Sequence, residues 1–460
     1  MVRKKRKSFR FFIAFLTSKA IQVFIKMFFK DKGTHMPGKL AMKMCPDFLS
    51  RIGRPETVIA ITGTNGKTSV SHFVNNIFIS SGYKIINNEK GSNMLSGIAS
   101  SLIDAANIYG NVKEKIAVFE VDERVSGYIY DHIPPTYLLC TNLFRDSIKR
   151  NGHSEFILTK IKSSVPKTTT LILNADDLIS INIGNKENKR FFFSVNKVDS
   201  SNQFKNIVND ISVCPNCKNK LEYEYRHYHH IGKARCLKCD FKSPIPKYIV
   251  EKIDLKKRTL TVKEENKKYN YNLISNSVYN LYNIISSIAV ARVFGLEHKE
   301  IKVAFEKMEL KKDRLNVQKI KDKEVITLLS KDQNPISCSR MFDYVSSQPD
   351  DKAIVLFITD SKDKVHGSED ISWLYDTDFE YLKKDDIKQI IVGGSRCYDV
   401  SLRLKLAGIK DEIINLKPNY ENVEEIIKLN EVKKIFILYE LYAYPLANKL
   451  KENVKRRVGV

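Results

Sequence analysis

The segment from Thr62 to Ser69 limits what this chain can fold into more than any other stretch. It reads Thr-Gly-Thr-Asn-Gly-Lys-Thr-Ser, follows an apolar run at 57–61 and precedes a helical pattern from Lys67 to Ser80. A phosphate-binding turn needs this context of strand before and helix after. Similar apolar runs, separated by helical stretches, lie at 115–120, 136–140 and 169–174. Strands that alternate with helices predict an α/β fold with a parallel sheet and helices on both of its faces.

The residues of this phosphate loop (62–69) suit a nucleotide. Gly63 and Gly66 let the backbone turn tightly and point amides at phosphate oxygens, and the helix N-terminus adds positive potential. Lys67 is predicted to reach the terminal phosphates, and Thr68 to hold Mg²⁺. The strict Walker pattern fails, because Ile61 occupies its first glycine position. A glycine-rich turn that only starts a helix is the alternative, but the strand and helix around it favour a phosphate loop.

Two acidic clusters follow predicted strands. One reads Phe-Glu-Val-Asp-Glu at 119–123 and contains Glu120; the other reads Asn-Ala-Asp-Asp at 174–177. Ligands bind at the carboxyl ends of the strands in open α/β sheets, and carboxylates there can hold Mg²⁺. The alternative is that these carboxylates cap the following helices. For Asp176 and Asp177 the sequence leaves both interpretations open.

Four cysteines form two close pairs, Cys214 with Cys217 and Cys236 with Cys239. Their C-x₂-C-x₁₈-C-x₂-C spacing is typical of a tetrahedral Zn²⁺ ribbon. Four thiolates would fill the coordination shell, so we expect a structural metal that stabilises a small insert with little core. His229 and His230 lie between the pairs and are alternative ligands. Because the cysteines already fill the shell, we expect the histidines to be surface or packing groups.

The composition is that of a globular protein, with 460 residues and 43% hydrophobic residues. This length is enough for roughly three domains. The other four cysteines stand alone, which suits a reducing cytosol better than a disulfide framework; they are Cys45, Cys140, Cys338 and Cys397. The net charge of +24 favours polyanionic partners, among them nucleic acid, an acidic membrane surface or a phosphorylated substrate.

The first 30 residues contain nine Lys or Arg and no acidic residue. A spanning helix needs about 20 mostly apolar residues, and Lys19 and Lys26 interrupt this segment. No small-residue cleavage pattern follows it, which argues against a secretion signal. We therefore expect an amphipathic helix that lies in the plane of an anionic membrane surface. The alternative is a helix that packs on its own domain.

The changes in pattern along the chain predict three parts. Residues 1–50 form a basic amphipathic segment. Residues 51–310 form a central ATP-binding domain that contains a zinc ribbon insert at 205–247, and residues 311–460 form a second α/β domain. Charged residues between Lys307 and Lys323 look like a linker.

Together, the phosphate loop, the two acidic clusters and the segment from Tyr279 to Asn283 resemble the central domain of the Mur ligases, which use the same Gly-Thr-Asn-Gly-Lys-Thr form of the loop. The ribbon and the C-terminal part resemble one branch of that family, the MurT subunits of lipid II isoglutaminyl synthase. This similarity extends from Met36-Pro37-Gly38-Lys39-Leu40 to the stretch between Ser395 and Gly408.

The resemblance implies an ATP-dependent carbon–nitrogen ligase. Such an enzyme activates the α-carboxylate of D-glutamate in the lipid II stem peptide as an acyl phosphate, and ammonia converts it to D-isoglutamine. The implied cofactors are ATP, Mg²⁺ and Zn²⁺. Lys67 and Glu120 would be catalytic, and Thr68 and Glu120 would hold Mg²⁺. The nucleotide would be bound by Gly63, Thr64, Asn65, Gly66, Lys67, Thr68, Ser69 and Asn280.

The family also implies a partner that releases ammonia from glutamine. None of the four lone cysteines sits in a Gly-x-Cys-x-Gly elbow, so we expect a separate GatD-like glutaminase subunit in a heterodimer. Asp370 begins a segment, ending at Asp376, that resembles the one proposed to complete the partner's Cys-His pair; capping a helix is its alternative role. A cytoplasmic enzyme that is peripheral at the inner face of the membrane, where lipid II lies, is implied, and no nucleic acid partner is expected.

Several positions depart from the family pattern and put substrate-side and metal-side details in question. They include Ser147, Lys149, Ser277, Asp313, Asn316 and the stretch 440–443. Three other functions therefore remain open. They are a Mur-type ligase that adds an amino acid, a catalytically weakened homologue that acts as a scaffold, and a nucleic-acid-binding zinc-ribbon protein. The last of these would leave the phosphate loop without a role.

Overall fold

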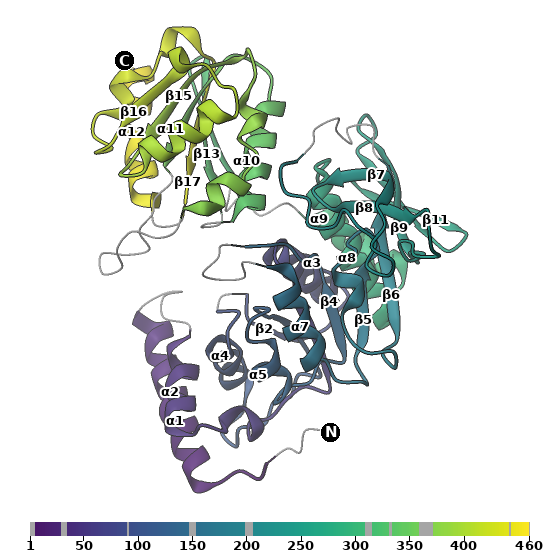
Figure 1. Ribbon diagram of the computed structural model, residues 1–460. Coiled ribbons are helices and arrows are strands. Elements are labelled where there is room, and N and C mark those ends of the chain that lie inside the picture. Colours follow the sequence, from purple (N-terminus) through teal and green to yellow (C-terminus); the bar gives the residue numbers. More distant parts are fainter. Residues whose placement is uncertain are drawn as a thin grey trace. The chain divides into compact units, whose positions relative to one another are not determined.

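The computed structural model describes residues 5–28, 35–89, 92–146, 153–197, 206–308, 315–330, 334–357, 371–440 and 443–459. These residues form two compact units (Figure 1). The first contains Met1–Phe144, Ser154–Lys205 and Asn209–Leu310, and the second contains Arg145–His153, Asn206–Val208 and Lys311–Val460. Each unit is built on its own sheet.

The first unit contains a nine-stranded sheet with the order β11-β10-β9-β6-β5-β4-β1-β3-β2. All strands from β2 to β9 in this order pair in parallel, whereas β9, β10 and β11 pair antiparallel. The strands are β1 Thr57–Thr62, β2 Ile85–Asn87, β3 Ile116–Glu120, β4 Tyr137–Cys140, β5 Thr170–Asn174, β6 Arg190–Val195, β9 Tyr248–Asp254, β10 Thr259–Glu264 and β11 Lys267–Asn272. This confirms the predicted α/β fold with a parallel sheet.

Helices cover both faces of this sheet. Successive side chains of a strand point to opposite faces, and apolar side chains lie on both. On one face, Val58, Ala60 and Leu138 belong to a core shared with α1, α2, α4, α5 and α7; on the other, α3 and α8 pack against the sheet. The helices are α1 Phe9–Phe28, α2 Met36–Met44, α3 Lys67–Ser80, α4 Leu95–Ala105, α5 Ser126–Tyr130, α7 Ser154–Ser164, α8 Val278–Phe294 and α9 His298–Lys307.

The helix α1 has two different faces. Phe11 and Phe15 are fully buried against the domain, together with Ala14 and Ser18. Lys19 Nζ donates to the carbonyl oxygen of Ile103 at 2.8 Å, and Lys26 pairs with Asp104. The opposite face exposes large apolar side chains, which are Phe9, Ile13, Leu16, Val23, Phe24, Met27 and Phe28. Within the described residues, α1 is the helix long and apolar enough to cross a membrane, but its packed face ties it to this unit.

The ribbon insert lies in the chain between β6 and β9. Its strands β7 (Leu221–Tyr228) and β8 (Ile231–Cys236) form a separate antiparallel pair. The buried apolar cluster of the insert is small and includes two of the cysteines; its members are Leu178, Cys214, Leu221, Ala234 and Cys236. So small a core adds little stability by burial, so the hairpin depends on its contacts with the rest of the unit and on the cysteine cluster.

The second unit contains a six-stranded sheet with the order β12-β13-β17-β14-β15-β16, parallel except for the β12–β13 pair. Separate cores cover its two faces. Its elements are β12 Leu315–Ile320, β13 Lys323–Leu329, α10 Pro335–Ser347, β14 Lys352–Phe357, β15 Ile387–Gly393, α11 Cys397–Leu406, β16 Ile414–Lys417, β17 Lys434–Tyr439 and α12 Tyr444–Gly459. The expectation of a linker at 307–323 was wrong for 315–320, because β12 pairs there with β13.

Candidate nucleotide site and metal centre

The phosphate loop lies at the carboxyl end of β1, in the middle of the parallel strands. Ile61 pairs with Glu120 of β3 on one side, and Thr62 pairs with Cys140 of β4 on the other. The residues that follow these three strands are therefore neighbours. In an open α/β sheet this edge is where ligands bind.

Two glycines give the loop its shape. Gly63 and Gly66 have φ values of 126° and 88°, which favour glycine. A Cβ atom on Gly63 would lie less than 3.0 Å from Thr141 Oγ1, and one on Gly66 would lie less than 3.0 Å from Asn283 Oδ1. The backbone is thus pressed between β4 and α8, and neither position accepts a larger residue without a shift of its neighbours.

The residues after β4 hold the loop from one side. The Thr64 amide donates to the carbonyl oxygen of Asn142 at 2.8 Å, and the Asn65 amide donates to Asn142 Oδ1 at 3.1 Å. Thr141 Oγ1 donates to the carbonyl oxygen of Asn65 at 2.7 Å. The amides of Thr64 and Asn65 are thus used to fix the loop. The first amides of α3, including those of Lys67 and Thr68, have no intrahelical acceptors and are available to an anion.

Lys67 begins α3 and is almost completely buried, with 9% of its side chain exposed. Its Nζ atom lies 2.9 Å from Glu123 Oε2 and also donates to the carbonyl oxygen of Gly63. Burial opposes the charged form, but attraction to Glu123 and Glu120 outweighs it and raises the pKa of Lys67 above its ordinary value. A fixed ammonium group therefore lies beside the loop.

Glu120 and Glu123 occupy different surroundings, although both come from the first acidic cluster. Glu120 ends β3 and its Oε1 accepts a hydrogen bond from Asn93 Nδ2 at 3.2 Å. Glu123 is buried and pairs with Lys67. The sequence predicted a site at this cluster but no role for Glu123. Its place in an acidic cluster after a predicted strand was a signal in the sequence, but that signal did not indicate the pairing with Lys67.

Asn280 lies in the first turn of α8, and Asn283 lies between it and the loop. Its Oδ1 accepts a hydrogen bond from Asn283 Nδ2 at 3.4 Å, and its Nδ2 donates to Ser275 Oγ at 3.0 Å. Asn283 in turn faces Gly66. Thr68 and Ser69 lie in the first turn of α3. The structure thus brings the predicted nucleotide-binding residues to one edge of the sheet, while their roles stay predictions.

The buried Nδ2 group of Asn65 is an independent sign of a ligand at this edge. It makes no hydrogen bond to any described residue, although Asn65 itself is buried. A buried amide without a partner costs free energy unless a ligand or water satisfies it. The loop, its fixed cation and this donor together fit the phosphates of a nucleotide.

Asp176 and Asp177 use their oxygens within the protein. Asp177 Oδ1 accepts from the amides of Ile179 and Ser180 at 3.0 and 3.3 Å, which is an Asx-type turn that leads into the short 3₁₀ helix Ser180–Asn182, whose N-cap is Ile179. Asp176 Oδ2 accepts from Ser194 Oγ and Tyr282 Oη, each at 2.7 Å. These contacts give both carboxylates a role in the local structure, although neither caps the 3₁₀ helix by a side-chain hydrogen bond from its N-cap position.

The four ribbon cysteines meet at one end of the β7–β8 hairpin. Their Sγ atoms all lie within 4.8 Å of one another, with Cys214 and Cys239 at 3.5 Å and Cys217 and Cys236 at 3.4 Å. Tetrahedral thiolates with Zn–S bonds of about 2.3 Å would be separated by about 3.8 Å. The donor set and its spacing therefore fit Zn²⁺.

The histidines lie at the other end of this hairpin and are not part of the cysteine cluster. His229 and His230 are buried, as packing groups are. His230 Nε2 lies 3.2 Å from Asp177 Oδ1, and its ring lies 4.5 Å from that of Phe144.

Part of the C-terminal prediction cannot be placed. Asp370 lies outside the described residues, as do Ser147, Lys149 and Asp313. The segment that follows Asp370 forms the 3₁₀ helix Ser372–Asp376, in which Trp373 and Leu374 are buried. Asp376 pairs with Arg145 at 3.3 Å within the second unit.

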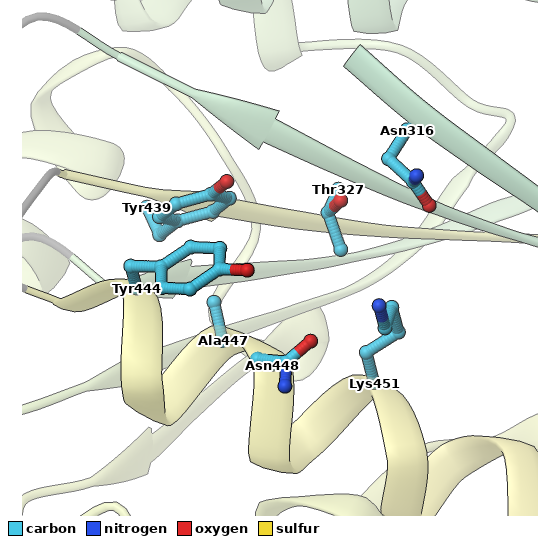
Figure 2. A pocket seen from close by; sticks show the side chains of 7 residues that line it. All are labelled: Asn316, Thr327, Tyr439, Tyr444, Ala447, Asn448 and Lys451. Atoms are coloured by element: carbon cyan, nitrogen blue, oxygen red, sulfur yellow. The ribbon is translucent and has the colours of Figure 1, made fainter. Parts of the chain in front are cut away.

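One cavity of the second unit, of about 230 Å³, is lined by one departure from the family pattern and by the two tyrosines that flank another (Figure 2). Asn316 of β12 replaces the expected acidic residue. Tyr439 and Tyr444 flank the altered stretch 440–443. The cavity is lined by Asn316, Thr327, Tyr439, Tyr444, Ala447, Asn448 and Lys451. These departures therefore lie in the C-terminal unit and outside the phosphate loop.

Known proteins share both parts of the chain. The Mur ligase middle domain family matches residues 61–291, and the MurT ligase C-terminal family matches residues 329–443. A protein of Staphylococcus aureus (strain COL), subunit MurT of lipid II isoglutaminyl synthase (glutamine-hydrolyzing), is 31% identical over 385 residues, which cover 83% of this chain and 85% of that protein. The subunit of the same name from Streptococcus pneumoniae (strain ATCC BAA-255 / R6) is 28% identical over 414 residues, or 88% and 90% of the two chains.

A solved structure supports the fold independently. A pseudomurein peptide ligase type C from Methanothermus fervidus superposes with a TM-score of 0.62 at 20% identity, covering 92% of this chain and 85% of that one. At 20% identity this likeness shows the fold alone. The relatives of higher sequence identity indicate the branch of the family.

Proposed function

The chain belongs to the MurT family of Mur-type ligases, and from this membership we propose that it is the synthetase subunit of a lipid II isoglutaminyl synthase. It is an ATP-dependent ligase that forms a carbon–nitrogen bond. Its acceptor is the α-carboxylate of D-glutamate in the lipid II stem peptide, and its product is D-isoglutamine. The observation that carries the proposal is the buried Lys67 ammonium at the start of α3, beside a loop whose backbone favours glycine at positions 63 and 66.

The cofactor roles follow from the residues around this loop. ATP, when bound with Mg²⁺, supplies the phosphoryl group that converts a carboxylate, a poor electrophile, into an acyl phosphate with a good leaving group. The loop and the first amides of α3 hold the phosphates, and Lys67 neutralises their charge. Thr68 and Glu120 offer oxygen ligands for Mg²⁺. Asn280 is the remaining residue proposed to bind the nucleotide, and its Oδ1 accepts a hydrogen bond from Asn283 beside the loop.

The metal of the ribbon has a structural role in this proposal. Four thiolates leave no open position for water or substrate, so the site does not take part in the reaction. Cys214, Cys217, Cys236 and Cys239 would hold Zn²⁺ and thereby the β7–β8 hairpin.

A glutaminase partner is needed because this chain offers no suitable nucleophile among its lone thiols. Cys45, Cys140, Cys338 and Cys397 are all buried. Burial raises the pKa of each thiol, most strongly for Cys140 and Cys338. Glutamine hydrolysis by a cysteine needs an accessible thiolate. The relatives are subunits of glutamine-hydrolyzing enzymes by name, and a GatD-like subunit is the partner we propose, with Asp370 orienting its histidine.

The acceptor is lipid-linked, so the enzyme works at the inner surface of the cell membrane. The exposed face of α1 suits this surface, because it presents Val23, Phe24 and Met27 on a helix that is fixed to the central unit. Lys39 and Lys43 are exposed on the neighbouring helix α2, where they add attraction to anionic lipids. We place the chain in the cytoplasm, peripheral at the membrane.

Mass spectrometry of lipid II tests the reaction. The chain, purified with its co-encoded glutaminase, should lower the mass of lipid II by about one dalton when ATP and glutamine are present, since replacing OH by NH₂ does so. A mass gain of an amino acid residue would favour an amino-acid-adding ligase, and an unchanged mass would favour a scaffold. Asp370→Ala should reduce the reaction with glutamine but spare it with added ammonium; an equal loss in both would exclude the proposed role of Asp370.

A further inference from the structure

The β7–β8 hairpin has the metal-binding cysteines at one end and a buried turn at the other. Cys236 ends β8, and Cys214 and Cys217 precede β7, so the metal closes the open end of the hairpin. The turn at the opposite end contains His229, which has a φ of 47°, and His230. Hairpin turns are usually exposed, yet both histidines are buried. The buried turn therefore has a packing partner.

The turn packs against the segment that follows β4. The His230 ring lies 4.5 Å from the Phe144 ring, and the Tyr228 ring stacks on Phe144 at 6.0 Å. His230 Nε2 contacts Asp177 Oδ1, whose other oxygen accepts from the Leu143 amide at 2.7 Å. The hairpin thus fixes residues 143 and 144 through both aromatic and polar contacts.

Phe144 is bound in turn to the phosphate loop. Its amide donates to Thr64 Oγ1 at 2.9 Å, and Thr64 Oγ1 donates to the carbonyl oxygen of Phe144 at 3.2 Å. The Thr64 amide is held by Asn142. The hairpin turn therefore contacts Phe144, and Phe144 contacts Thr64 of the phosphate loop. Both contacts lie within the first unit.

A second connection reaches the other side of the loop. The Tyr228 ring lies 4.3 Å from Tyr279, and the Gly232 amide donates to the carbonyl oxygen of Asp176 at 2.9 Å. Asp176 accepts from Tyr282 of α8. Tyr282 precedes Asn283, which faces Gly66. The hairpin turn thus supports both walls between which the loop is pressed.

We propose that the metal-bound ribbon insert is a positioning element of the nucleotide site, and that metal occupancy sets nucleotide affinity through Phe144 and His230. The insert has too small a core to hold the hairpin alone, so the metal supplies the missing folding free energy. Without it, Phe144 loses its three ring neighbours in the hairpin, Tyr228, His229 and His230, and the loop loses its support. This inference rests on the proposed nucleotide binding and assigns no role in the chemical step to the metal.

Nucleotide affinity of the full-length chain tests the inference. We would measure the dissociation constant of a fluorescent ADP analogue with excess Mg²⁺, and determine zinc content by mass spectrometry of the metal. Zinc removal with a chelator of low Mg²⁺ affinity should weaken binding at least tenfold, and added Zn²⁺ should restore it. Phe144→Leu and His230→Gln should weaken binding roughly three- to tenfold at full zinc occupancy, as the loss of one or two contacts predicts.

The matched control is Arg235→Ala. Arg235 lies in β8 of the same hairpin, but its side chain is exposed and pairs with Glu222. This variant should bind zinc and nucleotide as the wild type does. Melting temperatures show whether a variant that binds nucleotide weakly is still folded. If the zinc-free chain unfolds, the affinities of Phe144→Leu and His230→Gln test the inference in its place.

The outcomes distinguish this inference from the proposed function. If the wild type binds nucleotide and Lys67→Met does not, the proposed site holds. If Phe144→Leu and His230→Gln then bind as tightly as the wild type, the ribbon does not position the loop and the inference is wrong. A wild type that binds no nucleotide would contradict the proposed function itself.

Discussion

The Nζ atom of Lys67 lies 2.9 Å from Oε2 of Glu123, and both side chains are buried where α3 begins. The pair holds a positive charge beside the phosphate loop before any nucleotide arrives. A buried charge is costly without its partner. Glu123 thereby keeps Lys67 charged and in place, and an incoming phosphate would take over part of that attraction.

Removing Glu123 should therefore harm stability more than removing the whole pair. Glu123→Gln leaves the Lys67 ammonium buried with weaker partners and should destabilise the chain by about 3–5 kcal/mol, as broken buried pairs do. Lys67→Met in the same chain should recover part of this loss, because the uncompensated charge is gone. Thermal unfolding of the two single variants and the double variant measures the coupling. Strictly additive losses would mean that the pair does not interact.

Gly66→Ala should reduce nucleotide affinity at least tenfold. Its φ of 88° is unfavourable for alanine, and the added Cβ would press on Asn283 Oδ1 and shift the loop. Gly82→Ala is the matched control, because Gly82 has a φ of 86° but open space around its Cβ position. That change should cost only about 1 kcal/mol of stability and leave binding unchanged. Equal effects of both variants on affinity would show that backbone strain alone is responsible.

Asp176 should make the fold less stable as the pH rises. Burial raises the pKa of Asp176 from 3.8 to about 6, although Ser194 and Tyr282 donate hydrogen bonds to it. The folded chain therefore holds this proton more tightly than the unfolded chain, and the stability that the proton provides is lost between about pH 4 and 6. Asp176→Asn should gain up to about 3 kcal/mol relative to the wild type from pH 4 to pH 8.

Melting temperatures of both proteins across this pH range measure the effect. Asp322→Asn, a change of a carboxylate that is 76% exposed, should follow the wild type at every pH. A constant difference between Asp176→Asn and the wild type would show that folding does not raise the pKa of Asp176.

Charged substitutions on the exposed face of α1 should prevent membrane binding. Val23→Glu with Phe24→Glu removes two exposed apolar side chains and adds repulsion from anionic lipids, so partition to phosphatidylglycerol vesicles should fall at least tenfold. Ile79→Glu, an equally exposed apolar position on α3, is the control and should bind as the wild type does. Vesicle co-sedimentation measures both. A wild type that does not bind vesicles would contradict the proposed membrane role of α1.

Local patterns were sufficient to predict the fold and the position of the loop. The apolar run before Gly63 and the helical pattern after Lys67 correctly predicted β1 and α3, because both signals lie within a few residues of each other. The cysteine spacing predicted a cluster that the structure forms. For the N-terminal helix the structure shows the packing on the domain that one alternative predicted, whereas binding of its exposed face to a membrane stays a prediction.

Contacts between distant segments could not be read from the sequence. Glu123 pairs with Lys67 across 56 residues, and His230 reaches Asp177 across 53; no local pattern encodes such pairs. The role of Asp177 in a local turn likewise needed the positions of the neighbouring amides. The strand β12 was missed because its charged residues resemble a linker, while its partner β13 supplies the pairing.

The central claim is that the site primes a carboxylate as an acyl phosphate. It is tested most directly with lipid II that carries ¹⁸O in the α-carboxylate of D-glutamate, incubated with the purified enzyme, ATP, Mg²⁺ and ammonium. When the amine displaces the phosphate, one carboxylate oxygen leaves with it, so the inorganic phosphate should carry one ¹⁸O for each amide formed. Amidated lipid II together with unlabelled phosphate would contradict the account.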